Sequence, residues 1–203
     1  MKFFFRLIKL CALLLLLALI FHNFTARLLL IVGLRHYLGV PVEVQGARVD
    51  FLNTQIIFEG IRIKNPPDFP HGILADISTV FVDFEISSLF KGRLYFDEIV
   101  VHFEELRALR IPDGRLNLMA LRPLKDQRDV SQERADEGKT PFPPTFYRFV
   151  LNLRRAVFTD LSGPVPNQKT FDLKLEQAVY RHVGSLKDVF EIIVWETTKR
   201  MGL

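Results

Sequence analysis

The first two dozen residues of this 203-residue chain constrain its fold more than any other feature, because they are too apolar for an ordinary surface helix. Residues 10–21 form an unbroken apolar run, LCALLLLLALIF, and apolar side chains extend it from Phe3 to Phe24. The short run alone has the length of a signal-peptide core, whereas a membrane-spanning helix needs about 20 residues. The longer stretch reaches that length if Arg6 and Lys9 extend their charges to the membrane surface.

The residues after the apolar run favour an uncleaved anchor over a cleaved signal peptide. Signal peptidase needs small residues at positions −1 and −3 of its site. Ala26 satisfies the first position, but Phe24 then occupies the second. The basic residues among the first nine place the N-terminus in the cytoplasm. We therefore expect residues 1–24 to be a single transmembrane anchor, with the main domain on the far side of the membrane.

A second apolar stretch, residues 28–34, is too short to span a membrane. It is either the continuation of the anchor helix at the membrane surface or an amphipathic helix packed on the following sheet, and the sequence leaves both readings open. Gly39 and Pro41 end the helix in either case. We assign residues 25–39 to a juxtamembrane helix.

Residues 40–121 alternate between apolar and polar side chains and predict a β-rich region. The clearest half-buried strand covers residues 77–86 and places four apolar side chains on one face: Val80, Val82, Phe84 and Ile86. Strict alternation puts another set on one face of the preceding strand: Ile57, Glu59, Ile61 and Ile63. Leucines at positions 116–121 predict a short returning strand, and the whole chain offers roughly seven to nine strands.

The second half of the chain begins with a change in composition. Residues 122–145 are dense in charge, end in a proline cluster and predict a flexible loop. Residues 146–183 alternate as a β-hairpin that completes the sheet, and residues 184–203 form an amphipathic helix that Ser185 caps. The predicted fold is mainly β (α+β), with an N-terminal transmembrane helix followed by a curved, mostly antiparallel sheet or groove and a C-terminal amphipathic helix.

Six short segments then occur in a recognisable order. They are LGVPVEV at 38–44, IRIKNPPDF at 61–69, VFVDF at 80–84, LFKGRL at 89–94, DEIVV at 97–101 and DGRLNL at 113–118. With the anchor before them, residues 1–121 resemble the N-terminal region of the AsmA-like proteins of Gram-negative bacteria. The resemblance implies a bacterial inner-membrane location, a periplasmic β-rich groove, and a role in phospholipid transport or envelope assembly. Large family members continue for hundreds of residues, and this chain is too short to bridge two membranes alone.

Enzymatic chemistry has no support in the sequence. The five histidines are isolated, the single cysteine lies within the anchor, and phosphate-loop and nucleophile-elbow motifs are absent. We therefore expect no catalytic, cofactor or metal site. The net charge, 27 − 23 = +4, is too small and scattered to indicate nucleic-acid binding.

Two functions remain open from the sequence. The first is phospholipid handling or envelope assembly, with acyl chains held by eight candidate residues: Val80, Val82, Phe84, Ile86, Leu94, Phe96, Phe149 and Leu151. The same residues fit a closed hydrophobic core equally well. The second is a membrane-tethered interaction module that binds another envelope protein by strand addition or through its charged loop.

Overall fold

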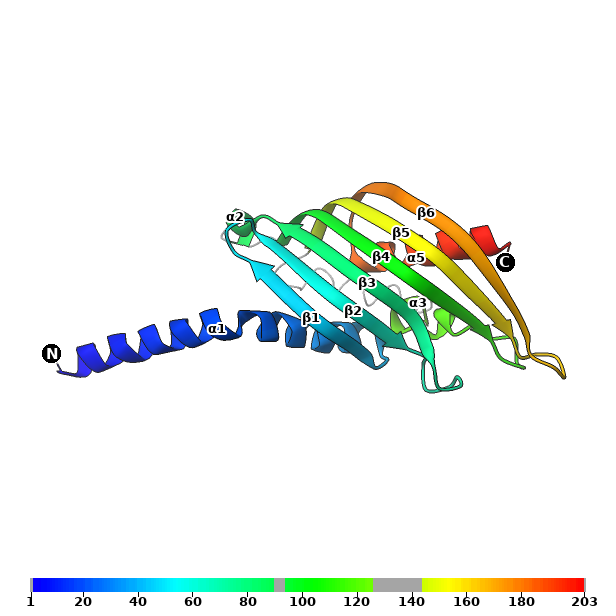
Figure 1. Ribbon diagram of the computed structural model, residues 1–203, viewed down its shortest axis with the longest axis horizontal. Coiled ribbons are helices and arrows are strands. Elements are labelled where there is room, and N and C mark those ends of the chain that lie inside the picture. Colours follow the sequence, from blue (N-terminus) through cyan, green and yellow to red (C-terminus); the bar gives the residue numbers. More distant parts are fainter. Residues whose placement is uncertain (1, 90–93, 126–143, 203) are drawn as a thin grey trace.

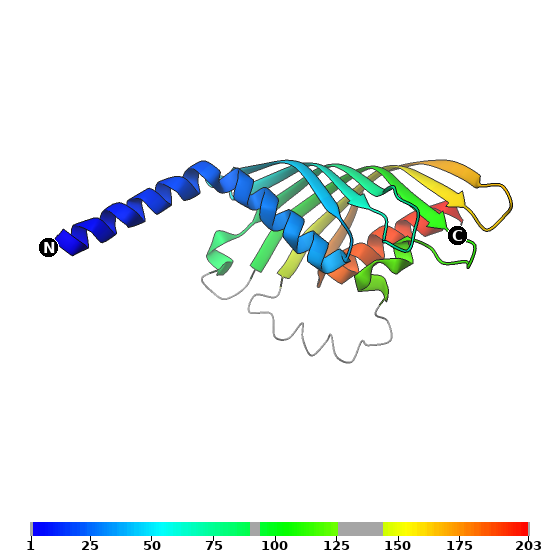
Figure 2. The ribbon, with the colours of Figure 1, turned by 90° about the horizontal axis from the view of Figure 1, so that it is seen from below.

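The computed structural model describes residues 2–89, 94–125 and 144–202, which form a six-stranded sheet with helices on one face (Figure 1). The strands, adjacent in chain order, are β1 (Val42–Asp50), β2 (Gln55–Lys64), β3 (Ile73–Phe84), β4 (Leu94–Arg110), β5 (Pro144–Asp160) and β6 (Asn167–Val183). The helices are α1 (Lys2–Leu38), α2 (Ile86–Leu89), the 3₁₀ turn η1 (Leu118–Ala120), α3 (Arg122–Lys125) and α5 (Leu186–Met201). Figure 2 shows α1, α3 and α5 on the same side of the sheet.

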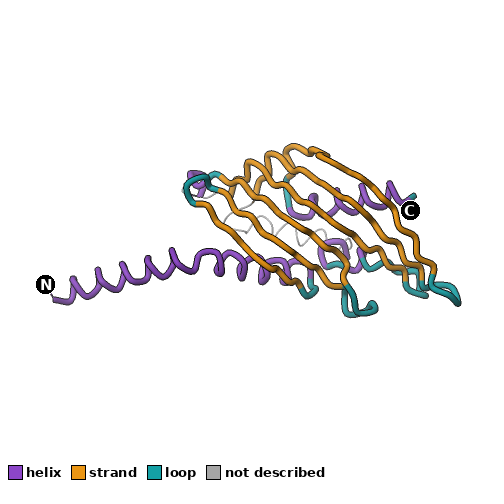
Figure 3. Tube along the Cα trace, viewed as in Figure 1, coloured by secondary structure: helices purple, strands orange, loops and turns teal. Residues whose placement is uncertain are grey.

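The mainly β class is confirmed, and the sheet is mixed. Four of the five strand pairings are antiparallel, and β4 pairs with β5 in parallel. The expected count of seven to nine strands is wrong, because the described chain uses fewer and longer strands (Figure 3). The returning strand expected near residue 116 is reduced to one bridge between Arg110 and Leu116. Beyond that bridge the side chain of Asn117 caps η1 and turns the chain away from the sheet.

A ladder of ion pairs accompanies the parallel pairing of β4 with β5. Each paired residue of β4 lies opposite the residue 50 positions later, as Glu98 lies opposite Arg148. Glu98 binds Arg148 at 3.1 Å, and further along the strands Glu104 binds Arg154 at 2.8 Å. Opposite charges at matched positions favour this register.

Gly60 reverses the alternation of side chains along β2. Its φ angle of +61° is open to glycine and strained for other residues. Phe58 on one side of Gly60, and Ile61 and Ile63 on the other, are all buried. The expectation that Ile57 shares a face with Ile61 and Ile63 is therefore wrong, because it assumed unbroken alternation.

The same reversal occurs further across the sheet, where the strand registers shift. In β4 the buried apolar side chain after Phe103 is Leu106, three positions later rather than two. In β5 Ala156 is buried three positions after Leu153 in the same way. Irregularities of this kind bend strands and increase their twist. They also keep one continuous apolar face over the full length of the sheet.

Helix α1 is continuous from the N-terminal apolar segment onto the sheet. Its C-terminal part packs against the core through Leu30, Leu34 and Leu38, as the reading of a helix packed on the sheet expected. Gly39 ends it as expected, with a φ angle of +72° and its amide donating to the Arg35 carbonyl at 3.0 Å. Within the described ranges, no helix combines the length and apolarity that crossing a membrane requires.

Helix α5 closes the chain and carries the expected cap. The Ser185 hydroxyl accepts a hydrogen bond from the amide of Asp188 at 3.2 Å, and Gly202 ends the helix at a φ angle of +70°. One face of α5 is buried against the sheet through Val189, Ile193 and neighbouring residues. The opposite face is exposed, so the helix is amphipathic as predicted.

Candidate functional site

The most distinctive feature of the structure is an apolar cavity of about 500 Å³ between the sheet and its helices. Its wall comes from α1, strands β2 to β5, the η1 region and α5, and every residue that lines it is Ala, Val, Leu, Ile or Phe. A volume of this size lies within the range of roughly 300–1,000 Å³ that small-molecule sites occupy. The wall provides only methyl, methylene and aromatic groups, so the cavity matches an apolar ligand.

Aromatic rings form the wall where β4 and β5 begin. The rings of Phe96 and Phe146 are stacked with centroids 5.2 Å apart, and Phe149 follows three residues after Phe146 in β5. Phe146 and Phe149 are fully buried, so these rings are held in place by the core behind them. Stacked aromatic pairs gain about 0.5–1.5 kcal/mol beyond their burial, which stabilises this part of the wall.

The wall at the opposite end of the cavity includes η1 and the residue that follows it. Leu118 and Leu121 are buried and line the cavity there. Asn117 holds this segment in place, because its fully buried side chain accepts hydrogen bonds from the amides of Leu109 and Leu118 at 2.8 and 2.9 Å. Its amide group also donates to the carbonyl of Arg107 at 2.8 Å. A buried side-chain amide with all its hydrogen bonds made is a fixed point in the fold.

Helix α5 covers the cavity and is attached to β6 through a half-buried polar contact. The Tyr180 hydroxyl donates to the Glu196 carboxylate at 2.8 Å. Burial, with the hydrogen bond to Glu196, raises the pKa of Tyr180 to about 12. Burial acts to raise the pKa of Glu196, but hydrogen bonds from Tyr180 and Arg200 outweigh it and the pKa is lowered. The contact therefore persists across the physiological pH range and holds α5 over the sheet.

The most buried carboxylate of the described chain, Glu105, lies in the ion-pair ladder. It binds Arg155 at 2.5 Å and also contacts Arg107, while its own exposure is 7%. Burial acts to raise the pKa of Glu105, but the hydrogen bonds and charges of the two arginines lower it overall. This group does not line the apolar cavity. Its geometry is that of a structural ion pair.

The structure brings together half of the eight residues selected from the sequence. Val80, Val82, Phe96 and Phe149 all line the cavity. Leu151 is fully buried in the core but is absent from the cavity wall. Phe84 is half-buried and also lies outside the wall, beyond a register shift at the end of β3. The side chains of Ile86 and Leu94 lie outside the described part of the structure.

Sequence reasoning missed the contributions of the helices and of β2 to the cavity. Leu30 and Leu34 of α1, Phe190 and Ile193 of α5, and Leu121 line it together with the sheet. The apolar spacing of α5 was visible in the sequence and identified its buried face, but not what that face covers. For α1, the three- and four-residue spacing of leucines near position 30 is the signal that identifies the packed face.

The described part of the chain contains no cluster of three or more His, Cys, Asp or Glu residues placed to hold a metal ion. The charged loop expected at residues 122–145 lies mainly outside the described residues, although residues 122–125 form α3 and the Arg122 guanidinium donates to the His36 carbonyl at 2.7 Å. Comparisons of the chain with protein-family models, curated proteins and solved structures find no match.

Proposed function

We propose that this chain is a membrane-anchored, non-enzymatic lipid-handling protein whose apolar cavity receives an acyl chain of a phospholipid. The observation that carries the proposal is the cavity of about 500 Å³ with a wholly apolar wall. Water is a poor occupant, because a buried water needs two to four polar partners. An acyl chain is a good one, since each buried methylene contributes about 0.8 kcal/mol.

The exposure of the apolar wall supports the same conclusion. Apolar surface that faces water rather than other apolar groups costs roughly 25 cal/mol per Å². A ligand that covers the wall removes this cost, so the fold is more stable when an apolar ligand fills the cavity.

The membrane location in this proposal comes from the sequence. Residues 1–24 serve as the anchor, with the N-terminus in the cytoplasm and the sheet on the far side of a bacterial inner membrane, as the AsmA-like resemblance implies. Because the chain is too short to bridge two membranes alone, it loads or shields lipid near the membrane that anchors it. Other envelope proteins are then the expected acceptors.

The alternative, a module that binds a partner by strand addition, has less support. β1 and β6 are the edge strands of the described sheet, and such edges do pair with partners. Helix α1 packs against β1, which leaves β6 as the edge to consider. However, Lys174, Gln177 and His182 interrupt β6 with φ angles of +44°, +51° and +55°. These irregularities leave only short regular segments for an added strand, which is how natural edge strands avoid pairing.

The test is photocrosslinking of the full chain in phospholipid nanodiscs that contain a phospholipid with a photoactivatable acyl chain. The proposal predicts adducts on the peptides of β3, β4, β5 and α5 that line the cavity. Lipid around the anchor labels residues 1–24 in any case, and this labelling serves as the internal control. Adducts confined to residues 1–24 would show that the apolar residues are a closed core and would overturn the proposal.

A further inference from the structure

A cluster of exposed apolar side chains lies where α1 meets the end of the sheet. The turn between β1 and β2 presents Phe51, which is 51% exposed, and Leu52, which is 96% exposed. On α1, Phe21 is 53% exposed and Phe24 is 61% exposed. We call these four residues the collar.

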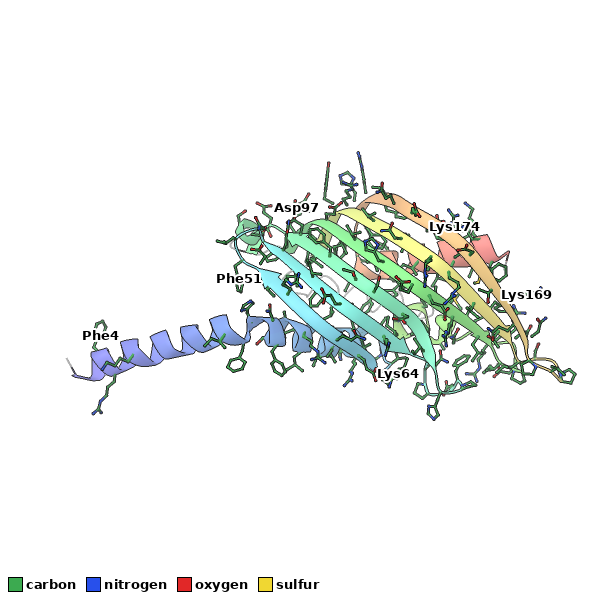
Figure 4. All side chains as sticks on the ribbon, in the orientation of Figure 1. Phe4, Phe51, Lys64, Asp97, Lys169 and Lys174 are labelled. Carbon is green, nitrogen blue, oxygen red and sulfur yellow. The ribbon has the colours of Figure 1, made fainter. Side chains whose placement is uncertain are left out.

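Two contacts hold the turn against the helix. The rings of His22 and Phe51 lie 5.1 Å apart, and the Asn23 side-chain oxygen accepts a hydrogen bond from the amide of Val49 at 2.8 Å. Figure 4 shows Phe51 at the end of the sheet that faces the N-terminal half of α1. The two parts of the collar therefore lie at the same level along α1, although they come from segments about 30 residues apart in the chain.

The turn that carries the collar is internally hydrogen-bonded. One carboxylate oxygen of Asp50 accepts from the amides of Leu52 and Asn53 at 2.9 and 3.1 Å, and the other accepts from the Asn53 side chain at 2.7 Å. The hydrogen bonds from Asn53, with that from the Leu52 amide, lower the pKa of Asp50. Because these amides already have partners, they need no water as an acceptor.

Helix α1 bends near the point at which it reaches the sheet (Figure 2). The Thr25 hydroxyl donates to the carbonyl of Phe21 at 3.0 Å, and such bonds to the preceding turn bend helices. The bend separates the N-terminal apolar half of the helix from the half that packs on the sheet. The collar lies beside this boundary.

We propose that the collar docks on the surface of the phospholipid bilayer that holds the anchor, with Leu52 and the aromatic rings inserted among the headgroups. This inference rests on the proposed function, because it places residues 10–21 in the same bilayer. The occupant is assigned by continuity, since the collar adjoins the apolar run and adds aromatic side chains where a helix leaves the hydrocarbon. Interfacial apolar groups of this kind are buried about 5–10 Å deep.

Docking at the collar brings the bilayer to one end of the cavity. Ile56, which lines the cavity, follows the collar turn directly, and the amide of Phe84 binds the carbonyl of Thr54 at 3.1 Å at the same end of the sheet. The aromatic wall of Phe96 and Phe146 belongs to this end as well. An acyl chain thus passes from bilayer to cavity without crossing water, and Leu118 and Leu121 line the far end.

The experiment measures the lipid exposure of single positions in the full chain. Cys11 is the only cysteine, so Cys11→Ser gives a background for Leu52→Cys labelled with an environment-sensitive fluorophore. The matched control is Val165→Cys, another exposed apolar residue, at 74%, in the turn between β5 and β6. Both proteins are reconstituted into phosphatidylethanolamine and phosphatidylglycerol vesicles, with and without phosphatidylcholine spin-labelled near its headgroup.

We expect quenching at position 52 several-fold greater than at position 165, together with a blue-shifted emission at position 52 only. Equal quenching at the two positions, whether high or low, overturns the docking proposal. In a flotation assay, one outcome is that the protein rises with the vesicles and its photocrosslinks map to the cavity while position 52 stays unquenched. In that case the docking proposal alone fails, and the proposed function stands. If the protein does not float with the vesicles, the anchor and the docking proposal both fail.

Discussion

The side-chain amide of Asn117 donates to the side-chain oxygen of Asn65 at 2.9 Å, which joins the η1 end of the cavity to the connection between β2 and β3. The two residues are 52 positions apart, and Asn65 in turn donates to the carbonyl of Pro70 at 2.9 Å. Asn117 is fully buried, while Leu118 and Leu121 beside it line the cavity. One asparagine thus positions two residues of the cavity wall.

The first prediction concerns this asparagine. Asn117→Ala leaves the amides of Leu109 and Leu118 and the carbonyl of Arg107 without their partner in a buried site. We expect the free energy of unfolding to fall by at least about 2 kcal/mol, because each buried group left unsatisfied costs about 1–3 kcal/mol. Denaturant unfolding followed by circular dichroism measures the change. Asn167→Ala, at an exposed position, is the control, with an expected change within about 0.5 kcal/mol.

The second prediction concerns Gly60, where the buried face of β2 changes side. A Cβ atom at this position would lie 2.3 Å from the Gln45 side chain, and the φ angle of +61° disfavours other residues. We expect Gly60→Ala to lower the free energy of unfolding by about 1–3 kcal/mol, the usual cost of a strained backbone conformation. Thermal unfolding of the full chain in detergent measures it.

Gly33 provides the matched control for that substitution. It lies within α1, where an added Cβ atom meets nothing within 4 Å. Alanine is favoured over glycine in a helix by about 1 kcal/mol, so Gly33→Ala should raise the melting temperature or leave it unchanged. An equal fall in melting temperature for Gly60→Ala and Gly33→Ala would show that Gly60 has no special backbone role.

The elements with simple periodicity were predictable from the sequence. Alternation identified the strand around Val80 and Val82, and the cap at Ser185 identified the start of α5. Gly39 was recognisable as a helix end because glycine adopts the left-handed conformation at little cost. Each of these signals lies within a few residues of the feature that it specifies.

The features that depend on distant residues were not predictable. The reversal at Gly60 inverts the face assignment of β2, and a glycine within a strand indicates an irregularity without giving its consequence. The buried hydrogen bonds of Asn117 join it to residues on two other segments, so the sequence alone reads this region as another strand. Likewise, periodicity shows that Phe149 and Leu151 face inward, but only the arrangement of α1 and α5 determines which of them reaches the cavity.

The third prediction concerns pH and Glu105. Its pKa in the folded chain lies below the ordinary value of 4.5, so the stability that it contributes is complete above that value. This contribution is lost as the pH falls through the lowered pKa, because protonation removes the charge that binds Arg107 and Arg155. The free energy of unfolding of Glu105→Gln should therefore differ most from that of the original chain at neutral pH and converge with it in acid.

Urea unfolding at a series of pH values measures this difference, and Glu104→Gln is the control. Glu104 pairs with Arg154 on the neighbouring position of the ladder, but its side chain is 42% exposed. Exposed ion pairs contribute about 0–1 kcal/mol, so the control should change stability little at any pH. If the free energies of unfolding of Glu105→Gln and the original chain differ by a constant amount down to strongly acidic pH, the charge of Glu105 is not the source of the stabilisation.

The fourth prediction separates a ligand cavity from a core that is merely imperfectly packed. Val80→Phe adds volume to the cavity wall, so it should reduce acyl-chain photocrosslinking on β4 and α5 several-fold while the sheet stays folded. Val179→Phe makes the same change on β6, where the side chain is 42% exposed and outside the wall, and should leave crosslinking unchanged. In a lipid-free core, Val80→Phe should only raise stability by filling space, by about 0.5–2 kcal/mol. Lost crosslinking with retained folding therefore identifies the cavity as a lipid site, and equal crosslinking in both variants argues that the lipid binds elsewhere.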